Sequence, residues 1–380
     1  MDDHHTTGRV PARGVVDPGG VARCHHRVSG LQASPALPIP PPNCCFASAR
    51  RSVDQTPSGP LNKVSGMPSE HDERPFDPTR LNSQYYSANP PAYFRSRLHL
   101  LALAAGRPSE LITLLEAGVE YEGLHFTREE SHAPEGNPNL DAAFLVTESQ
   151  VLLHHASEAL IRLFFGHADL PPCPWLECAD FRGAAAFRKE VDRLASSLWP
   201  THLKEAVADV FLGGTPAEVS ADWSETAETA ERLLRVLATR LNEDAHMYNS
   251  TKHGMTVLSG DASVAFLSEE GEHIAGGSGP SVSFLESRKR PGSEVVWSQT
   301  TKWFSIQQAM LLTNLAITQM EALWQVARAR YVDADLAGVA MVTKEAIDTA
   351  LFEMRPAGVI FRFSHQVAVV KPAMGRGGTP

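Results

Sequence analysis

The sequence predicts a mainly α-helical protein, built as a helical bundle with a small antiparallel β insert late in the chain and a disordered N-terminal tail. Three observations support this fold class. Apolar residues recur with helical period over the segments 147–167, 232–254 and 304–331. Short segments rich in β-forming residues, separated by Gly, Ser and Asp, cluster within 255–303. Residues 1–66 are rich in Pro and Gly and show neither period, which is typical of disorder.

Two interpretations of residues 1–66 remain open. Their proline run LPIPPPN, with scattered Arg and His, favours a disordered tail. Alternatively, Met67 is the natural start, and the residues before it are translated upstream DNA. Because of this alternative, no function is assigned to the histidines of the tail. Residues 67–92 are expected to form an extended lead-in.

The helical bundle is expected to span residues 93–254. Glycines at positions 106, 118 and 254 are typical helix stop signals, and the proline-rich stretch 171–178 is expected to be a stiff connection. Helices are predicted over 95–106, 108–118, 140–167, 180–198, 202–212 and in the segment that ends at Gly254.

The remainder of the chain is divided into three parts. The β insert, 255–303, is expected to hold two or three antiparallel strands over 255–287 and a further strand at 294–301. Residues 304–371 are expected to supply C-terminal helices that complete the core, with a strand-like segment, GVIFRF, at 358–363. Residues 372–380 are Gly-rich and predicted to be a loose tail.

Composition narrows the classes of function. The chain has 380 residues, 43% of them hydrophobic, which is enough for one large domain or two ordinary ones. Its net charge of −10 argues against broad, non-specific DNA binding. No uncharged apolar run reaches the length of a membrane span, and the five cysteines form no disulfide framework. We therefore expect a cytoplasmic protein without membrane contact, and predict no metal and no cofactor.

Polar residues on an otherwise apolar helix mark the first candidate site. In the segment 147–167, Glu148, His155, Glu158 and Arg162 are separated by seven, three and four positions, so they share one helix face. The rest of this helix is rich in Leu, Ala and Phe, so these polar groups are expected to be partly buried. Buried polar groups need partners, which predicts a second polar surface opposite them.

A second helix carries the complementary set. Asn242, His246 and Asn249 share one face, and Lys252 and His253 follow near the helix end. The helix dipole favours cations at this end, which explains Lys252 and His253 without any function. It does not explain the polar residues of the preceding turns.

The two helices are predicted to pair through these faces. Glu158 with Lys252, or Arg162 with Asn249, are the pairs we expect. Ionic groups in a core rarely add stability over apolar ones, so such a pairing marks either a site or a structural network that specifies the fold. Both interpretations remain open.

The spacing of Arg and His adds a resemblance to a known family. Arg162 and His167 form R-x4-H, and Arg240 and His246 form R-x5-H, within a mainly helical bundle. This resembles the R-x4-6-H motif of the HEPN (higher eukaryotes and prokaryotes nucleotide-binding) superfamily, whose ribonucleases place Arg and His at a dimer cleft. The resemblance implies that Arg162 stabilises a phosphate while His167 acts on the ribose 2′-hydroxyl, or that Arg240 and His246 do so. The N-x2-K-H-G segment also resembles uncharacterised bacterial helical proteins.

Three functions follow as hypotheses. The first is a HEPN-like homodimer that binds or cleaves RNA or a nucleotide, with Lys252 and His253 also meeting phosphate. The second is a non-catalytic binding or regulatory module, whose polar helix faces form a structural network. The third is a metal-dependent hydrolase built on the two carboxylates of the first helix with His155 and His246.

Overall fold

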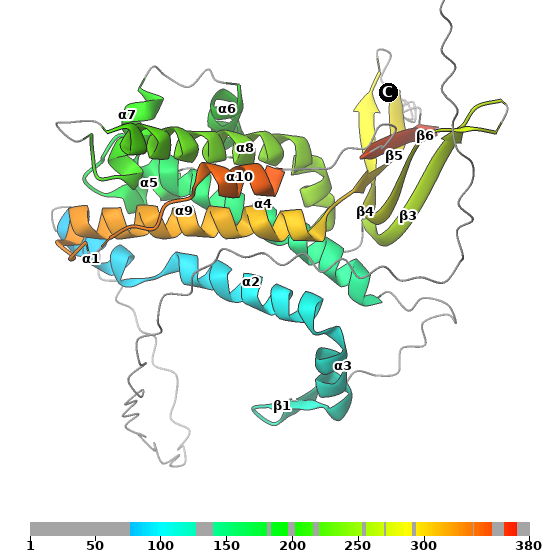
Figure 1. Cartoon of the computed structure of the whole chain (residues 1–380), viewed down its shortest axis with the longest axis horizontal. Helices are drawn as coiled ribbons and strands as arrows, with labels where there is room; N and C mark the ends of the chain where they lie inside the picture. The colour runs from blue at the N-terminus through cyan, green and yellow to red at the C-terminus, as the bar shows by residue number, and fades with distance from the viewer. Residues whose placement is uncertain are drawn as a thin grey trace, which may run out of the picture. The chain divides into compact units, whose positions relative to one another are not determined.

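The computed structural model describes residues 77–126, 140–180, 184–196, 202–215, 220–252, 256–269, 271–290, 294–336, 338–351 and 361–370. All of them belong to a unit that spans Glu73–Pro380. They form helices and a small antiparallel sheet late in the chain, which confirms the predicted fold class (Figure 1). The predicted disordered tail and the predicted loose tail at 372–380 lie outside the described residues.

Three long helices form the centre of the core. They are α4 (Leu140–His167), α8 (Ala221–Thr251) and α9 (Ile306–Val332), and α4 packs against both of the others (Figure 1). The hydroxyl of Ser305 accepts a hydrogen bond from the Gln308 amide at 3.1 Å and begins α9, while Asp333 ends it with a φ of 51°. None of the described helices is long and apolar enough to cross a membrane.

Shorter helices cover this core. They are α2 (Pro90–Gly106), α6 (Ala184–Ala195), α7 (Leu203–Phe211) and α10 (Lys344–Leu351), whereas α3 (Pro108–Ala117) packs on α2 and none of its described residues is buried. Helix α6 packs on α8, and α2 packs on both α4 and α9. Each lies where the apolar period predicts a helix, with ends displaced by a few residues.

Two short helices and a hairpin correct the predictions. Part of the lead-in 67–92, expected to be extended, forms α1 (Pro78–Ser87), and part of the stretch 171–178 forms α5 (Pro174–Asp180). In both cases a proline occupies the first helical position, where its missing N–H is no loss. The carboxylate of Asp77 also caps α1, accepting from the Thr79 amide at 3.0 Å. The strands β1 (Val119–Tyr121) and β2 (Leu124–Phe126) form a hairpin that no prediction contained.

The late sheet has four antiparallel strands in the order β3-β4-β5-β6. The predicted strands appear as β3 (Val257–Leu267), β4 (His273–Lys289) and β5 (Val295–Trp303). The fourth, β6 (Arg362–Val370), comes from the segment expected to supply only helices and one short strand. The insert 255–303 is therefore not self-contained, because β5 needs β6 as its second neighbour.

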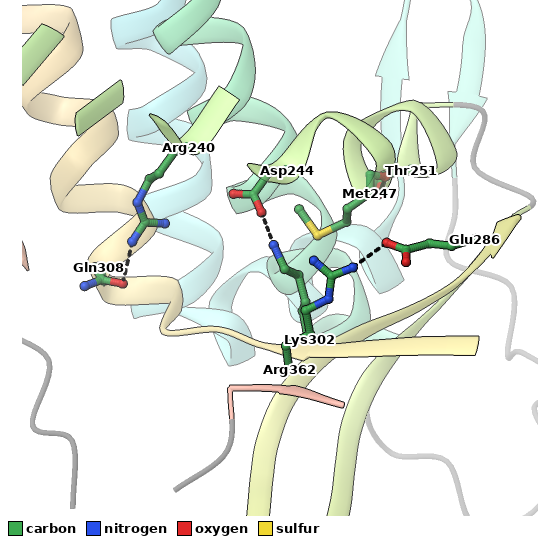
Figure 2. A network of polar contacts seen from close by, with 8 residues as sticks. All are labelled: Arg240, Asp244, Met247, Thr251, Glu286, Lys302, Gln308 and Arg362. Carbon is green, nitrogen blue, oxygen red and sulfur yellow. Dashed lines mark hydrogen bonds and ion pairs between the residues drawn. The ribbon is translucent and has the colours of Figure 1, made fainter. Parts of the chain in front are cut away.

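Ion pairs and hydrogen bonds fix α8 against the sheet and α9 (Figure 2). Lys302 of β5 donates to the carboxylate of Asp244 on α8, and these side chains are only 13% and 12% exposed. One helical turn earlier, Arg240 donates to the side-chain oxygen of Gln308 on α9 at 3.2 Å. The position of the C-terminal turns of α8 is therefore set by charged groups as well as by apolar packing.

A glycine allows α5 to approach α4. A side chain at Gly166 would contact the sulfur of Cys178 and lie 3.2 Å from the Cys178 amide nitrogen and 3.3 Å from the Pro174 carbonyl oxygen. We expect Gly166→Ala to lower the free energy of unfolding by about 1–2 kcal/mol, because overpacking outweighs the gain in helix propensity. Chemical denaturation measures this. Gly106→Ala is the matched control, since nothing lies within 4 Å of its added carbon. Equal stability of the two variants would contradict the close approach.

Candidate functional site: a polar cleft between α4, α6 and α8

The two polar helix faces meet in one cleft. It has a volume of about 710 Å³ and is lined by residues of α4, α6 and α8. We name it the polar cleft. The lining residues from α4 and α8 include His154, Glu158, Arg162, Asn242, His246, Tyr248, Asn249 and Lys252. Six of the residues on the two predicted polar faces are among them, namely Glu158, Arg162, Asn242, His246, Asn249 and Lys252.

The pairs expected between the helices do not form. Glu158 is bound within its own helix, where its Oε1 accepts from Nη2 of Arg162 at 2.7 Å. The side chains of both residues are slightly more than a quarter exposed. The ammonium of Lys252 instead lies 5.7 Å from the centre of the Tyr248 ring. The two faces therefore surround an open space rather than closing on each other.

His155 and Glu148 lie outside this cleft, which corrects their assignment to the site. Arg97 of α2 binds both of them, donating to the Glu148 carboxylate and approaching Nδ1 of His155 at 3.2 Å. Since Nδ1 then accepts, Nε2 carries the proton that is directed at the Tyr248 hydroxyl. Burial and the charge of Arg97 lower the pKa of His155. This half of the polar face is a network that links α2, α4 and α8.

The neighbouring His154 takes the cleft position instead. Its ring stacks on Tyr248 with the centroids 3.8 Å apart and an angle of 10° between the planes. Burial lowers the pKa of His154 to about 4, so the ring is neutral at pH 7. Consecutive helix residues point about 100° apart, so His154 and His155 do not face the same space. Arg97 binds His155 outside the cleft, and His154 therefore lines it.

His167 is also placed away from the cleft. It is 2% exposed, and both ring nitrogens are hydrogen-bonded. Nδ1 lies 2.6 Å from the Leu163 carbonyl oxygen, so it donates, and Nε2 lies 2.7 Å from the Tyr86 hydroxyl, so it accepts. Burial lowers the pKa of His167 to about 4. A catalytic role beside Arg162 is therefore not supported, because the imidazole has no free nitrogen.

The second Arg–His pair does not converge either. Arg240 binds Gln308 (Figure 2). It also lines a separate surface hollow beside Glu231 and Glu243. His246 is exposed and lines the polar cleft, which Arg240 does not. His253, predicted as a third catalytic group, lies outside the described residues.

Helix α6 supplies the wall that sequence patterns did not reveal. Phe187 lies under the Arg162 guanidinium, whose central carbon is 4.0 Å from the ring centre. Arg188 and Asp192 line the same cleft and are exposed. Charged residues at mixed spacing on α6 are typical of an ordinary solvated face, so nothing in the sequence singles them out. Tyr248 could have been found, since it lies four residues before Lys252 and thus shares its face.

The described side chains do not assemble a metal centre. Within the ranges given above, no group of three or more His, Cys, Asp and Glu residues is arranged to hold a metal ion. Glu148 and His155 are bound by Arg97, and burial raises the pKa of the Cys178 thiol to about 11. The hydrolase hypothesis therefore has no assembled ligand set in this part of the chain.

Comparisons with protein-family models, curated proteins and solved structures found no match to this chain.

Proposed function

We propose that this protein binds the phosphate of a nucleotide or of RNA in the polar cleft. The observation that carries the proposal is the position of Arg188 and Lys252, one from α6 and one from α8. Both line the cleft, and neither has an ion pair with another described residue. Arginine and lysine are the residues that most often bind phosphate in proteins.

The charge balance of the cleft supports an anionic ligand. Among the described lining residues, Arg162, Arg188 and Lys252 face two carboxylates, Glu158 and Asp192, so this part of the lining is net positive. The whole chain, by contrast, has a net charge of −10. The charges of Glu158 and Arg162 balance each other, because the two side chains form an ion pair. The remaining charged groups are the cations Arg188 and Lys252 and the carboxylate of Asp192.

Size and hydrogen-bonding groups support a nucleotide rather than a bare ion. A volume of about 710 Å³ lies within the range of small-molecule sites. Asn242 and Asn249 offer amide groups that can hydrogen-bond to the sugar and phosphate oxygens of a nucleotide.

The proposal is for binding rather than cleavage. Cleavage of the HEPN kind needs an arginine and a histidine that act together, and neither candidate pair shares the cleft. This favours the non-catalytic alternative, with the network of Arg97, Glu148 and His155 as a structural element beside the site. A homodimer and a cytoplasmic location remain predictions from the sequence.

Titration calorimetry with inorganic pyrophosphate tests the proposal. We expect Arg188→Met and Lys252→Met each to weaken binding by about 10-fold, because each removes one charge-assisted hydrogen bond. Methionine retains much of the aliphatic stem, so packing changes little. Lys204→Met on α7, which breaks an exposed pair with Glu228, is the control and is expected to leave affinity unchanged. Absence of binding to the parent protein, or equal affinity in all three variants, would contradict the proposal.

A further inference from the structure

A second cavity adjoins the polar cleft at the C-terminal end of α8. Its volume is about 780 Å³, and it lies among the last turns of α8 and the strands β3, β4 and β5. Its walls include the apolar side chains of Leu258, Phe284, Leu285 and Trp297. We name it the junction cavity.

The two hollows differ in charge. No Asp, Glu, Lys or Arg is among the described residues that line the junction cavity, whereas five charged residues line the polar cleft. The polar groups of the junction cavity are uncharged serine, threonine and glutamine side chains together with His246 and Asn249. Such a lining suits an uncharged group that combines apolar area with a few hydrogen bonds.

Two of the described residues line both hollows. His246 and Asn249 lie one helical turn apart on α8, both are exposed, and both line the polar cleft and the junction cavity. A molecule that crosses this turn of α8 therefore contacts both spaces. The ion pair between Asp244 and Lys302 holds this part of the helix against β5 (Figure 2).

Several apolar side chains that line the junction cavity are exposed to solvent. Leu258 is 74% exposed and Leu285 is 50% exposed, although both come from the sheet rather than from a loop. The indole N–H of Trp297 has no hydrogen bond to any other described residue, in contrast to that of Trp303, which donates to the Ala262 carbonyl at 2.9 Å. Exposed apolar area beside an unbonded indole is typical of a binding surface.

We infer that one ligand occupies both hollows, with an anionic group in the polar cleft and an uncharged aromatic ring in the junction cavity, as in a nucleoside phosphate. The inference rests on the proposed function, because it assigns the anionic end of the ligand to the polar cleft. The aromatic end is assigned by the uncharged lining and by Trp297, on whose ring a heterocycle can stack.

Calorimetry of the full chain with two probes, inorganic pyrophosphate and ADP, tests the inference. We expect ADP to bind at least 10-fold more tightly than pyrophosphate, because its base contacts the junction cavity. Trp297→Ala should remove this difference and leave pyrophosphate affinity unchanged, whereas Trp297→Phe, which keeps an aromatic ring, should retain much of it. Trp175→Ala on α5 is the matched control, since Trp175 is 40% exposed and lies outside both hollows.

The outcomes separate the two proposals. No binding of pyrophosphate to the parent protein overturns both of them. Pyrophosphate binding with equal affinity for ADP overturns the inference alone, as does a Trp297→Ala variant that loses affinity for both probes equally. Circular dichroism of each variant shows whether it retains the parent fold. If Trp297→Ala does not fold, the affinities of Trp297→Phe for ADP and pyrophosphate test the inference instead.

Discussion

Lys302→Met is expected to lower the free energy of unfolding by about 3–5 kcal/mol, as removal of one partner from a buried ion pair typically does. The variant leaves the Asp244 carboxylate unpaired at a position where its side chain is 12% exposed. The Arg362–Glu286 pair also lies at this side of the sheet, where it holds β6 to β4 (Figure 2). Urea unfolding followed by circular dichroism measures the change.

Two comparisons distinguish this effect from a general loss of charge. Lys204→Met breaks a pair whose side chains are 46% and 66% exposed, and such surface pairs contribute about 0–1 kcal/mol. The double variant Asp244→Leu with Lys302→Met removes both charges and should recover most of the lost stability. If Lys302→Met is no less stable than Lys204→Met, the ion pair does not hold α8 against the sheet.

Acidification is expected to destabilise the protein between pH 6.5 and pH 4, in part through His167. Burial lowers the pKa of this histidine from the ordinary 6.5 to about 4. Above pH 6.5 the ring is neutral in the folded and the unfolded chain. As the pH falls through this window, the unfolded chain binds a proton that the folded chain does not, so the free energy of unfolding decreases. The loss amounts to about 3 kcal/mol and is complete below pH 4.

The surroundings of His167 explain why protonation is resisted. Its Nε2 accepts from the Tyr86 hydroxyl, and Tyr331 lies at a ring-centroid distance of 6.2 Å. The charge of Arg330 opposes a second cation, and no described carboxylate contributes to its pKa. His154, with its own pKa of about 4, adds a loss of similar size in the same window.

Unfolding free energies of the parent and of His167→Gln across pH 4–7 test this linkage. Stability at pH 7 also changes in the variant, so the readout is the decrease from pH 7 to pH 4. We expect that decrease to be about 3 kcal/mol smaller in His167→Gln. The same substitution at the exposed His99 controls for the change of residue type. An unchanged decrease in His167→Gln would contradict the assignment.

Long periodic segments made most of the fold predictable. The apolar stripes of α4, α8 and α9 extend over many turns, so their positions follow from helical period alone. Helices α1 and α5 are short and begin with proline. Proline ends a helix when it lies in the interior but is well tolerated at the first position, so from sequence alone these prolines indicate a break rather than a helix start. The hairpin β1–β2 had a weak sequence signal. Glu122 and Gly123 both adopt positive φ in its turn, but such turns are normally marked by Asn-Gly, Asp-Gly or Gly-Gly rather than by Glu-Gly.

The candidate site was predictable only as two helix faces. Spacing on one helix shows which residues share a side, but not which other element packs against them. Arg97 separates His155 from the cleft, and Arg188 completes the cleft, yet both come from helices remote in sequence. For the same reason the sequence could not show that Tyr86, 81 residues away, binds Nε2 of His167.

The late position of α9 has a consequence for how the chain reaches its fold. Helices α1, α2, α4 and α7 all pack on α9, which begins at Ile306, and β5 pairs with a strand that begins at Arg362. During synthesis, the faces of these helices that pack on α9 therefore have no partner until most of the chain has left the ribosome, although α2 can already pack on α4 and α7 on α8. Contacts of such long sequence separation slow folding and prolong the exposure of apolar surface. The core of this chain is therefore completed later than that of a bundle whose consecutive helices pair with one another.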